Sequence, residues 1–585
     1  MSLTATPGPK TLVVFSDGTG NSAAKLQKTN VWRLYRALDL AAPTAALAAA
    51  GETAQIALYD DGVGTSEFRP RALLGGVFGY GLKRNVLDLY KFLCRNYRPG
   101  DRIYAFGFSR GAFTIRVLMG LVLRVGLLKH DDEASLQSDA PFAYRKYRRY
   151  FKARNLAGGF RWLRDKAIEF WSQHVRARAA PEFVHVEEVE FVGVWDSVAA
   201  YGMPVAEMTR AVDQWIWPAS MPNYVLSARV KQARHALALD DERDTFHPLL
   251  WDETDEAPSG DEPPRLQQVW FAGMHSDVGG GYPDDSLAHV ALDWMMEEAQ
   301  QCGLRFKRGM REQVAQEMNP LGPMHDSRSS LGMYYRYQPR RLSSLLDPPD
   351  PATLAMQDPD RSRAHGRLRG VVVHPSVLQR IRSNAGGYAP IVLPPQFSVC
   401  EASGHAREVV NIEVDTDAVW NDVWRRRAAY FVSVLLTFAL FALVWLPDSL
   451  CQGPWCLLSR AIAALGQFAP DMVQPVVRAW SSNPAVFGAL VLALWIAQRW
   501  SAALQRSIDD NMSALWRTSL AAAPAAVANA PPLRRGDASI ARLRKAWLYQ
   551  KSLQLMKWRI APAAFAALIL FSVGAAVVAL IGTAF

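Results

Sequence analysis

An unbroken apolar segment that runs into a serine between two glycines constrains this chain of 585 residues most. Residues 103–108 alternate non-aromatic apolar residues with aromatic ones and leave no polar face, which is typical of a central strand in a parallel sheet. Residues 111–128 follow at once with apolar side chains at helical spacing, among them Phe113, Val117 and Leu121. The sequence therefore predicts a strand, a sharp turn at Ser109 and a helix.

The turn reads Gly107-Phe108-Ser109-Arg110-Gly111, a Gly-x-Ser-x-Gly pattern that is typical of a nucleophile elbow. The serine occupies a strained turn, and the flanking glycines are needed because side chains there would collide with the neighbouring strand and helix. A serine hydroxyl is a poor nucleophile until a base accepts its proton. We therefore expect a histidine and an orienting carboxylate later in the chain, in the order serine, acid, histidine.

Two further apolar runs each deliver a polar residue at the end of a predicted strand. Residues 189–195 run into Asp196, and residues 269–274 run into His275. The carboxyl ends of parallel strands meet at one edge of the sheet, so we predict Ser109, Asp196 and His275 as catalytic residues. The competing acids are Asp240, Asp241, Asp244 and Asp277, and the competing histidines are His235, His247 and His289.

Short buried strands and amphipathic helices alternate over the first part of the chain. We expect strands at residues 11–15 and 55–59 and a helix at residues 77–97. This alternation predicts an α/β fold of the α/β-hydrolase type, with a mainly parallel sheet and flanking helices. C-terminal hydrophobic helices are expected in addition.

An oxyanion that develops during acyl transfer is stabilised by backbone N–H groups aimed at it. The amide of Arg110 is the first candidate, and the amide of Gly18 or Thr19, in the turn after the first strand, is the second. A tight turn held by the Asp17 side chain is the alternative role of that loop. Nucleotide binding there is disfavoured because the Walker lysine and a Gly-x-Gly-x-x-Gly pattern are both missing.

The length predicts more than one unit, since single cores rarely exceed about 250 residues. We assign residues 1–327 to a catalytic domain with caps or insertions around residues 130–185 and 205–262, and we expect loops and short helices at residues 215–261. Residues 328–424 are irregular and form a lid, a linker or an accessory region. Residues 425–585 form a membrane-anchoring region.

Long uncharged apolar runs occur only after Trp424. Residues 428–446 and 560–583 are each long enough to cross a bilayer, and residues 485–498 could span it, re-enter it or stay buried. Basic clusters beside these runs favour a cytoplasmic catalytic domain. The sequence thus predicts a multi-pass protein of the bacterial inner membrane with two or three transmembrane helices, and a buried helical hairpin in a soluble protein is the alternative.

The net charge of +10 fits such topology-setting flanks better than a nucleic-acid partner, because the basic residues gather beside the apolar runs. A basic and aromatic stretch, residues 144–178, is either a solvated surface helix or a lipid-facing one. The five cysteines show no zinc spacing, and no metal or cofactor is expected. Cys451 and Cys456 could form a disulfide if their loop faces an oxidising compartment, and two unpaired thiols are the alternative. The N-terminal residues lack the pattern of a cleavable signal peptide.

Several blocks of the sequence are similar to one family. They are residues 14–21, 107–112, 194–198, 238–243 and 270–282. Together they resemble the Tle-one-like catalytic domain of type VI secretion phospholipase effectors, long catalogued as a domain of unknown function. The resemblance implies an α/β-hydrolase fold, a Ser109–Asp196–His275 triad and a lipid ester as substrate. The apolar C-terminal region departs from it and looks more like part of a resident membrane protein than of an exported effector.

The leading hypothesis is a membrane-anchored serine hydrolase that cleaves carboxylic ester bonds of lipids, with the bilayer and its lipids as partners. The alternatives are an esterase or thioesterase with a soluble substrate and a catalytically silent membrane partner protein. No feature of the sequence indicates an oligomeric state.

Overall fold

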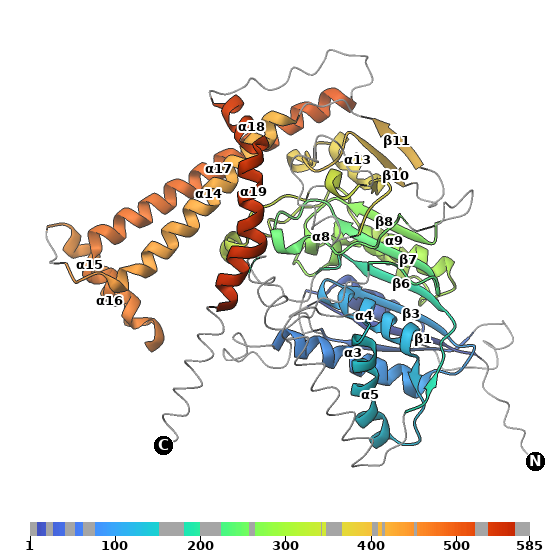
Figure 1. The fold of residues 1–585 in the computed structure, drawn as a ribbon. Helices are drawn as coiled ribbons and strands as arrows, with labels where there is room; N and C mark the ends of the chain where they lie inside the picture. The colour runs from blue at the N-terminus through green and yellow to red at the C-terminus, as the bar shows by residue number, and fades with distance from the viewer. Residues whose placement is uncertain are drawn as a thin grey trace, which may run out of the picture.

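The computed structural model describes residues 9–18, 27–40, 53–62, 77–150, 181–198, 207, 224–254, 256, 264–340, 342–346, 366–400, 407–411, 416–449, 453–520 and 536–567. Within these residues a nine-stranded sheet forms the centre, and two long helices project from it on one side (Figure 1).

The sheet is parallel except at one edge. Its strand order is β11-β10-β9-β8-β7-β6-β3-β1-β2, and of these pairs only β10 and β11 run antiparallel. The strands are β1 (Thr11–Ser16), β2 (Gln55–Asp60), β3 (Arg102–Phe108), β6 (Val189–Trp195), β7 (Val230–Ala238), β8 (Leu266–Phe271), β9 (Val372–Val373), β10 (Gln396–Cys400) and β11 (Arg407–Asn411). Two short strands, β4 (Leu127–Leu128) and β5 (Phe183–Val184), pair separately. The predicted mainly parallel sheet is confirmed.

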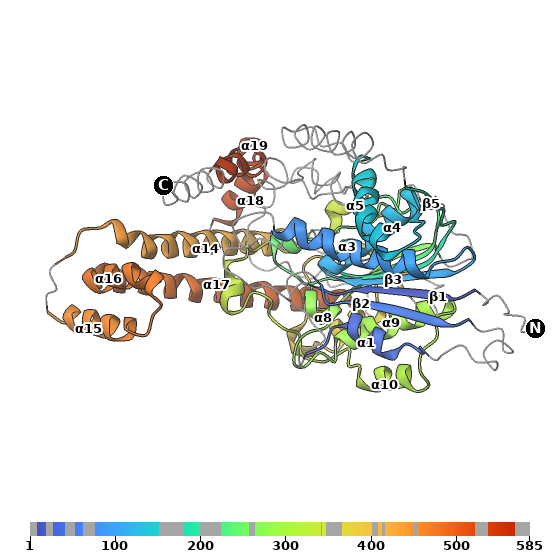
Figure 2. The same cartoon turned by 90° about the horizontal axis from the view of Figure 1, so that it is seen from below.

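Helices cover both faces of this sheet (Figure 2). One face carries α3 (Val77–Asn96), α4 (Arg110–Val125) and α5 (Glu133–Arg148), and the other carries α1 (Asn30–Ala37), α9 (Ala288–Gln301) and α10 (Met310–Glu317). In β1, Leu12 and Val14 pack into the first core, whereas Val13 and Phe15 pack into the second. A strand buried on both faces must be apolar throughout, which makes such a run recognisable in the sequence.

The structure corrects one expectation in the middle of the sheet. Residues 215–261 are predicted to hold loops and short helices, but Val230–Ala238 forms β7 between β6 and β8. Polar residues interrupt the apolar pattern by which this strand would be recognised in the sequence. Buried Arg234 pairs with Glu298 at 2.5 Å, and buried His235 accepts the Ser197 N–H at 3.1 Å. Because both polar groups find partners, the interior tolerates them.

Part of the segment expected to be a lid, linker or accessory region joins the same sheet. Strands β9, β10 and β11, with α13 (Pro375–Arg382), extend the sheet beyond β8. Val373 and Phe397 of this extension form a third core with Trp270 of β8. Residues 366–411 are therefore continuous with the central sheet wherever the structure describes them.

The two projecting helices form a hairpin. α14 (Asp417–Ala442) leaves the sheet and α17 (Pro484–Leu520) returns to it, while α15 (Trp455–Gly466) and α16 (Gln474–Ser482) lie at the far end (Figures 1 and 2). At the base, Val423 and Ile508 pack into the third core. Towards the tip large apolar side chains are exposed, among them Leu435 at 66% and Phe438 at 68%.

Two segments of this hairpin, Ala418–Trp445 and Pro484–Arg517, are long and apolar enough to cross a membrane. The first covers the predicted span 428–446 as far as residue 445, and the second contains the predicted span 485–498. The third predicted span, 560–583, lies largely outside the described residues, which end at 567 after α18 (Asp537–Lys545) and α19 (Trp547–Leu555). The basic stretch 144–178 is described only as far as residue 150 and is helical to residue 148. Cys456 is disulfide-bonded, and its predicted partner Cys451 lies outside the described residues.

Candidate active site

Ser109 lies in the turn between β3 and α4. Its φ of +59° is in the left-handed region, which residues with a side chain rarely adopt. The Ser109 N–H donates to the Trp195 carbonyl oxygen at 3.0 Å and so ties the turn to β6. The predicted strand, turn and helix are all present, and they put the serine at the carboxyl edge of the sheet.

The two glycines of the turn are required by close backbone contacts. A Cβ atom on Gly107 would lie 2.7 Å from the carbonyl oxygen of Gly111, at the start of α4. A Cβ atom on Gly111 would lie 2.1 Å from the carbonyl oxygen of Ser16, at the end of β1. Both distances are far below van der Waals contact, so the collisions that the pattern predicts are real.

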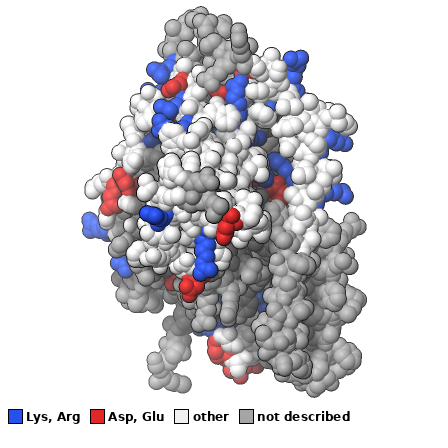
Figure 3. Space-filling view, turned by 90° about the vertical axis from the view of Figure 1, so that its left-hand side faces the viewer, with Lys and Arg blue, Asp and Glu red and all other residues white. Residues whose placement is uncertain are grey.

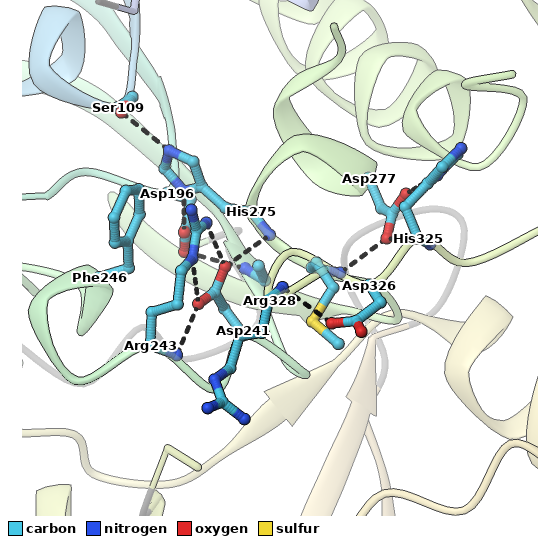
Figure 4. Close-up of polar contacts among 12 residues, drawn as sticks. Ser109, Asp196, Asp241, Arg243, Phe246, His275, Asp277, His325, Asp326 and Arg328 are labelled. Atoms are coloured by element: carbon cyan, nitrogen blue, oxygen red, sulfur yellow. Dashed lines mark hydrogen bonds and ion pairs between the residues drawn. The ribbon is translucent and has the colours of Figure 1, made fainter. Parts of the chain in front are cut away.

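Ser109, His275 and Asp196 form a hydrogen-bonded chain (Figure 4). His275 Nε2 lies 2.8 Å from Ser109 Oγ, and His275 Nδ1 lies 2.5 Å from Asp196 Oδ2. Ser109 follows β3, Asp196 follows β6, and His275 follows β8 as the first residue of α8 (His275–Gly279). The structure thus brings the three predicted site residues together from three strand ends.

This chain is shielded from water. The side chain of His275 is 6% exposed, that of Asp196 is fully buried, and Ser109 is also buried. Burial lowers the pKa of His275, although Asp196 opposes the shift, so the imidazole is neutral at neutral pH and can accept a proton. Burial alone would raise the pKa of Asp196, but Arg340 and His275 hold it below its usual range.

Arg340 binds the Asp196 carboxylate with both terminal nitrogens. The Nη1–Oδ1 and Nη2–Oδ2 distances are both 2.7 Å, and the same nitrogens donate to the carbonyl oxygens of Ala238 and Phe246. With its side chain only 1% exposed, Arg340 makes a buried bidentate ion pair. Sequence reasoning missed Arg340 because it lies in the irregular region, and the only signal was that a buried carboxylate needs a counter-charge.

The His275 ring is held by further contacts. Its centroid lies 4.7 Å from that of Phe108 and 5.0 Å from that of Phe246, which meets it edge-on. The His275 N–H donates to Asp241 Oδ2 at 3.2 Å, and Asp241 pairs with Arg243 at 2.6 Å (Figure 4). Rings on the side chain and an ion pair on the backbone therefore fix the imidazole relative to Ser109.

None of the other candidate acids and histidines contacts the Ser109 hydroxyl in the hydrogen bonds of the described chain. Their partners are Gly273 and Tyr388 for Asp240, Arg243 for Asp241, Arg336 for Asp244, His325 for Asp277, Ser197 and Gln268 for His235, Gln338 for His247, and Asp285 and Glu317 for His289.

The structure describes two of the three candidate oxyanion donors, the amides of Arg110 and Gly18. The Arg110 amide is in the first turn of α4, directly after Ser109. The Gly18 N–H donates to Asp17 Oδ1 at 2.6 Å, which is the tight-turn alternative for that loop. Asp17 Oδ2 also accepts the Thr29 and Tyr59 hydroxyls, at 2.5 and 2.6 Å. Thr19 lies outside the described residues.

Over the described ranges no group of three His, Cys, Asp or Glu side chains is arranged to hold a metal ion.

The chain is an α/β protein whose sheet edge carries the serine–histidine–aspartate geometry that serine hydrolases share. Residues 10–298 match the family described as "T6SS, Phospholipase effector Tle1-like, catalytic domain". The predicted resemblance is confirmed for this part of the chain, and it supports a lipase or phospholipase at the level of the family.

Two similar proteins are described only as uncharacterized. An uncharacterized protein of Saccharomyces cerevisiae, YEL023C, is 27% identical over 255 residues, which is 41% of this chain and 33% of that protein. The crystal structure of an uncharacterized protein from Pseudomonas aeruginosa is 13% identical with a TM-score of 0.30, covering 95% of this chain and 66% of that one. The match thus spans only a third of the length of the yeast protein.

Proposed function

We propose that this chain is a membrane-held serine hydrolase that cleaves carboxylic ester bonds of lipids, with phospholipids as the favoured substrates. The observation that carries the proposal is the hydrogen-bonded chain from Ser109 through His275 to Asp196, with steps of 2.8 and 2.5 Å. The family match to phospholipase effectors supports a lipid substrate. The strand-end positions of all three residues are those expected of an α/β-hydrolase.

In the proposed reaction Ser109 Oγ attacks the acyl carbonyl carbon while its proton passes to His275 Nε2. Asp196 accepts the Nδ1–H of the ring and stabilises the imidazolium that forms. His275 then donates the proton to the departing alcohol oxygen of the lipid, leaving the acyl group on Ser109. A water molecule deprotonated by His275 hydrolyses this acyl ester, which releases the fatty acid and restores the serine hydroxyl.

The proposed oxyanion donor is the Arg110 amide at the start of α4. The partial positive charge of a helix N-terminus favours a negatively charged oxygen there. The Gly18 amide already has an acceptor in Asp17, so it would have to exchange that partner to contribute.

The hairpin of α14 and α17 is the proposed membrane anchor. Exposed apolar side chains line both of its helices, for example Phe438 on α14 and Leu492, 57% exposed, on α17. Viewed from the hairpin end, the described surface is mostly uncharged, with scattered Lys, Arg, Asp and Glu side chains (Figure 3). Such a surface is costly in water and favourable in a bilayer.

The base of the hairpin is fixed to the rest of the chain by ion pairs. Arg425 contacts Asp537 of α18 at 2.5 Å, and Arg426 contacts Glu242, which follows β7, at 3.0 Å. The catalytic sheet therefore stays beside the basic end of the apolar helices. Since basic flanks favour the cytoplasmic side, we place the sheet on the cytoplasmic face of a membrane.

The test is fatty-acid release from phospholipid vesicles, set beside cleavage of short soluble esters, by the full chain and by its Ser109→Ala variant. Release from vesicles that is lost in the variant is the expected result. Cleavage of soluble esters alone would favour a soluble substrate. No turnover of either substrate by the wild type would favour the catalytically silent membrane partner.

A further inference from the structure

A cavity of about 330 Å³ lies between the hairpin and the loop that precedes Arg340. Its wall comes from three segments: residues 326–334, the α14 residues from Arg426 to Val434, and the α17 residues from Gln498 to Arg506. All of them lie beyond residue 298, where the family match ends. The catalytic residues do not line this cavity.

Arginine dominates the charge of the cavity. Arg328, Arg426 and Arg506 line it, and the only acidic residue among its lining side chains is Asp326. Glu242, outside the lining, pairs with Arg426 at 3.0 Å and lies 4.0 Å from Arg328. Arg506 makes no ion pair with any residue that the structure describes, so the cavity retains a positive charge.

The buried guanidinium groups of Arg328 and Arg426 are only partly paired within the described residues. Burial and the neighbouring Arg426 lower the pKa of Arg328, although Glu242 opposes the shift. The Nε groups of Arg328 and Arg426 are buried without a hydrogen-bond partner in the described part of the chain. An anion in the cavity would relieve the repulsion between the guanidinium groups.

Neutral polar side chains complete the wall. Ser433 Oγ accepts the Gln498 side-chain N–H at 3.1 Å, and the Tyr430 hydroxyl donates to the Tyr334 carbonyl oxygen at 2.9 Å. Ser501 also lines the cavity. The wall is thus held together by its own hydrogen bonds, and the guanidinium groups are its main donors to a ligand.

The cavity lies at the height where the apolar part of the hairpin ends. On α14 it begins at Arg426, just before the uncharged run 428–446, and on α17 it begins at Gln498, just after the uncharged run 485–497. Trp495 and Trp500 are exposed beside it, at 59% and 43%. Aromatic residues and arginines at the end of an apolar span are typical of the headgroup level of a bilayer.

We infer that this cavity binds the phosphate group of an anionic phospholipid, with Arg506 and Arg328 as its main cationic contacts. Asp326, Ala502 and Arg506 are exposed, so the cavity reaches the surface and a headgroup can enter. Guanidinium groups suit phosphate oxygens because they offer paired N–H donors. The assignment of this phosphate to a lipid rests on the proposed membrane insertion of the hairpin. Binding of a phosphate group in the cavity does not depend on the proposed catalytic activity.

The experiment titrates the full-length protein in detergent with an ether-linked phosphatidylglycerol and follows thermal unfolding. Ether lipids lack the ester that the proposed enzyme cleaves, so loss of hydrolysis cannot mimic loss of binding. A parallel titration with inorganic phosphate distinguishes a free anion from a headgroup. The variant is Arg506→Gln, and the matched control is Arg499→Gln, which removes the same charge from an exposed α17 residue that does not line the cavity.

We expect a saturable rise in unfolding temperature with the lipid, an apparent affinity about tenfold weaker in Arg506→Gln, and less than about a twofold change in Arg499→Gln. Ala502→Trp, which fills the cavity without altering charge, should weaken binding as well. Saturation by phosphate with the same dependence on Arg506 would support the anion site and assign it to a free anion. Equal affinities in the two arginine variants, or no saturation by either ligand, would overturn the inference.

Discussion

Arg340 offers the sharpest test of how the site is held together. Replacing it with methionine would leave the Asp196 carboxylate buried beside His275 without the bidentate partner that now lies 2.7 Å from each oxygen. Breaking a buried ion pair by removing one member costs about 3 to 5 kcal/mol, because the remaining charge is uncompensated. We therefore expect Arg340→Met to lower the free energy of unfolding by about that amount at pH 7.

The loss of unfolding free energy in Arg340→Met should be larger at neutral pH than at acidic pH. The pKa of Asp196 is depressed in the folded protein, so its stabilising contribution is present above the unfolded value of about 3.9 and is lost as the pH falls below it. The difference between wild type and Arg340→Met should therefore be full near pH 7 and should shrink at the acidic end. Denaturant unfolding at a series of pH values measures it.

Two further variants separate charge from shape. Arg340→Lys keeps the charge but not the two-nitrogen contact and should lie between wild type and Arg340→Met. Adding Asp196→Asn to Arg340→Met removes both ions, so much of the lost stability should return. This double-mutant cycle remains informative even if Arg340→Met alone is poorly folded.

Activity supplies a readout that a purely structural role would leave unchanged. With Arg340 gone and Asp196 still ionised, a cation near the imidazolium is missing, so the pKa of His275 should rise. The acidic limb of kcat/KM against pH for a short-chain ester should then move to higher pH in Arg340→Met. Wild-type stability together with a wild-type pH profile would refute the assigned role of Arg340.

Four other predictions follow from single positions. Gly111→Ala places a Cβ atom 2.1 Å from the Ser16 carbonyl oxygen and should cost about 1 to 3 kcal/mol and most activity, measured by unfolding and ester hydrolysis. Burial raises the pKa of Asp240 to about 7, so its ionisation destabilises the fold as the pH rises towards that value; the melting-temperature gain of Asp240→Asn should be larger at pH 8 than at pH 5. Ester hydrolysis by the wild type should fall as the pH drops through a His275 pKa below its usual value of about 6.5, and a midpoint above pH 7 would contradict the shift. Phe438→Asp should reduce retention in carbonate-washed membranes, since a charge in the apolar layer costs about 2.5 to 3.5 kcal/mol; unchanged retention would argue against insertion there.

Much of the sheet could be predicted from local pattern. β1 and β3 occur almost at their predicted bounds because a strand buried on both faces is uniformly apolar. α3 does so because its apolar residues follow helical spacing and a proline and a glycine come soon after its end. β7 could not be recognised in this way. Arg234 and His235 interrupt its apolar pattern, and their partners Glu298 and Gln268 lie far away in the sequence.

The candidate site also contains residues that a local sequence pattern identifies and one that it does not. Ser109, Asp196 and His275 each follow an apolar run, so the strand-end rule found them. Arg340 approaches Asp196 from a segment without periodicity, 144 residues later, and its contact exists only in three dimensions. The Gly18 amide illustrates the opposite case, because the turn was identified but its N–H already serves Asp17.

The central claim is that Ser109 is a nucleophile activated by His275, and labelling of the full chain with a fluorophosphonate tests it most directly. The matched control is Ser197→Ala, since Ser197 is also buried, adjoins Asp196, and its hydroxyl has no hydrogen-bond partner among the described residues. We predict labelling of the wild type and of Ser197→Ala, none of Ser109→Ala, and strongly slowed labelling of His275→Ala. Equal labelling of wild type and Ser109→Ala would contradict the account.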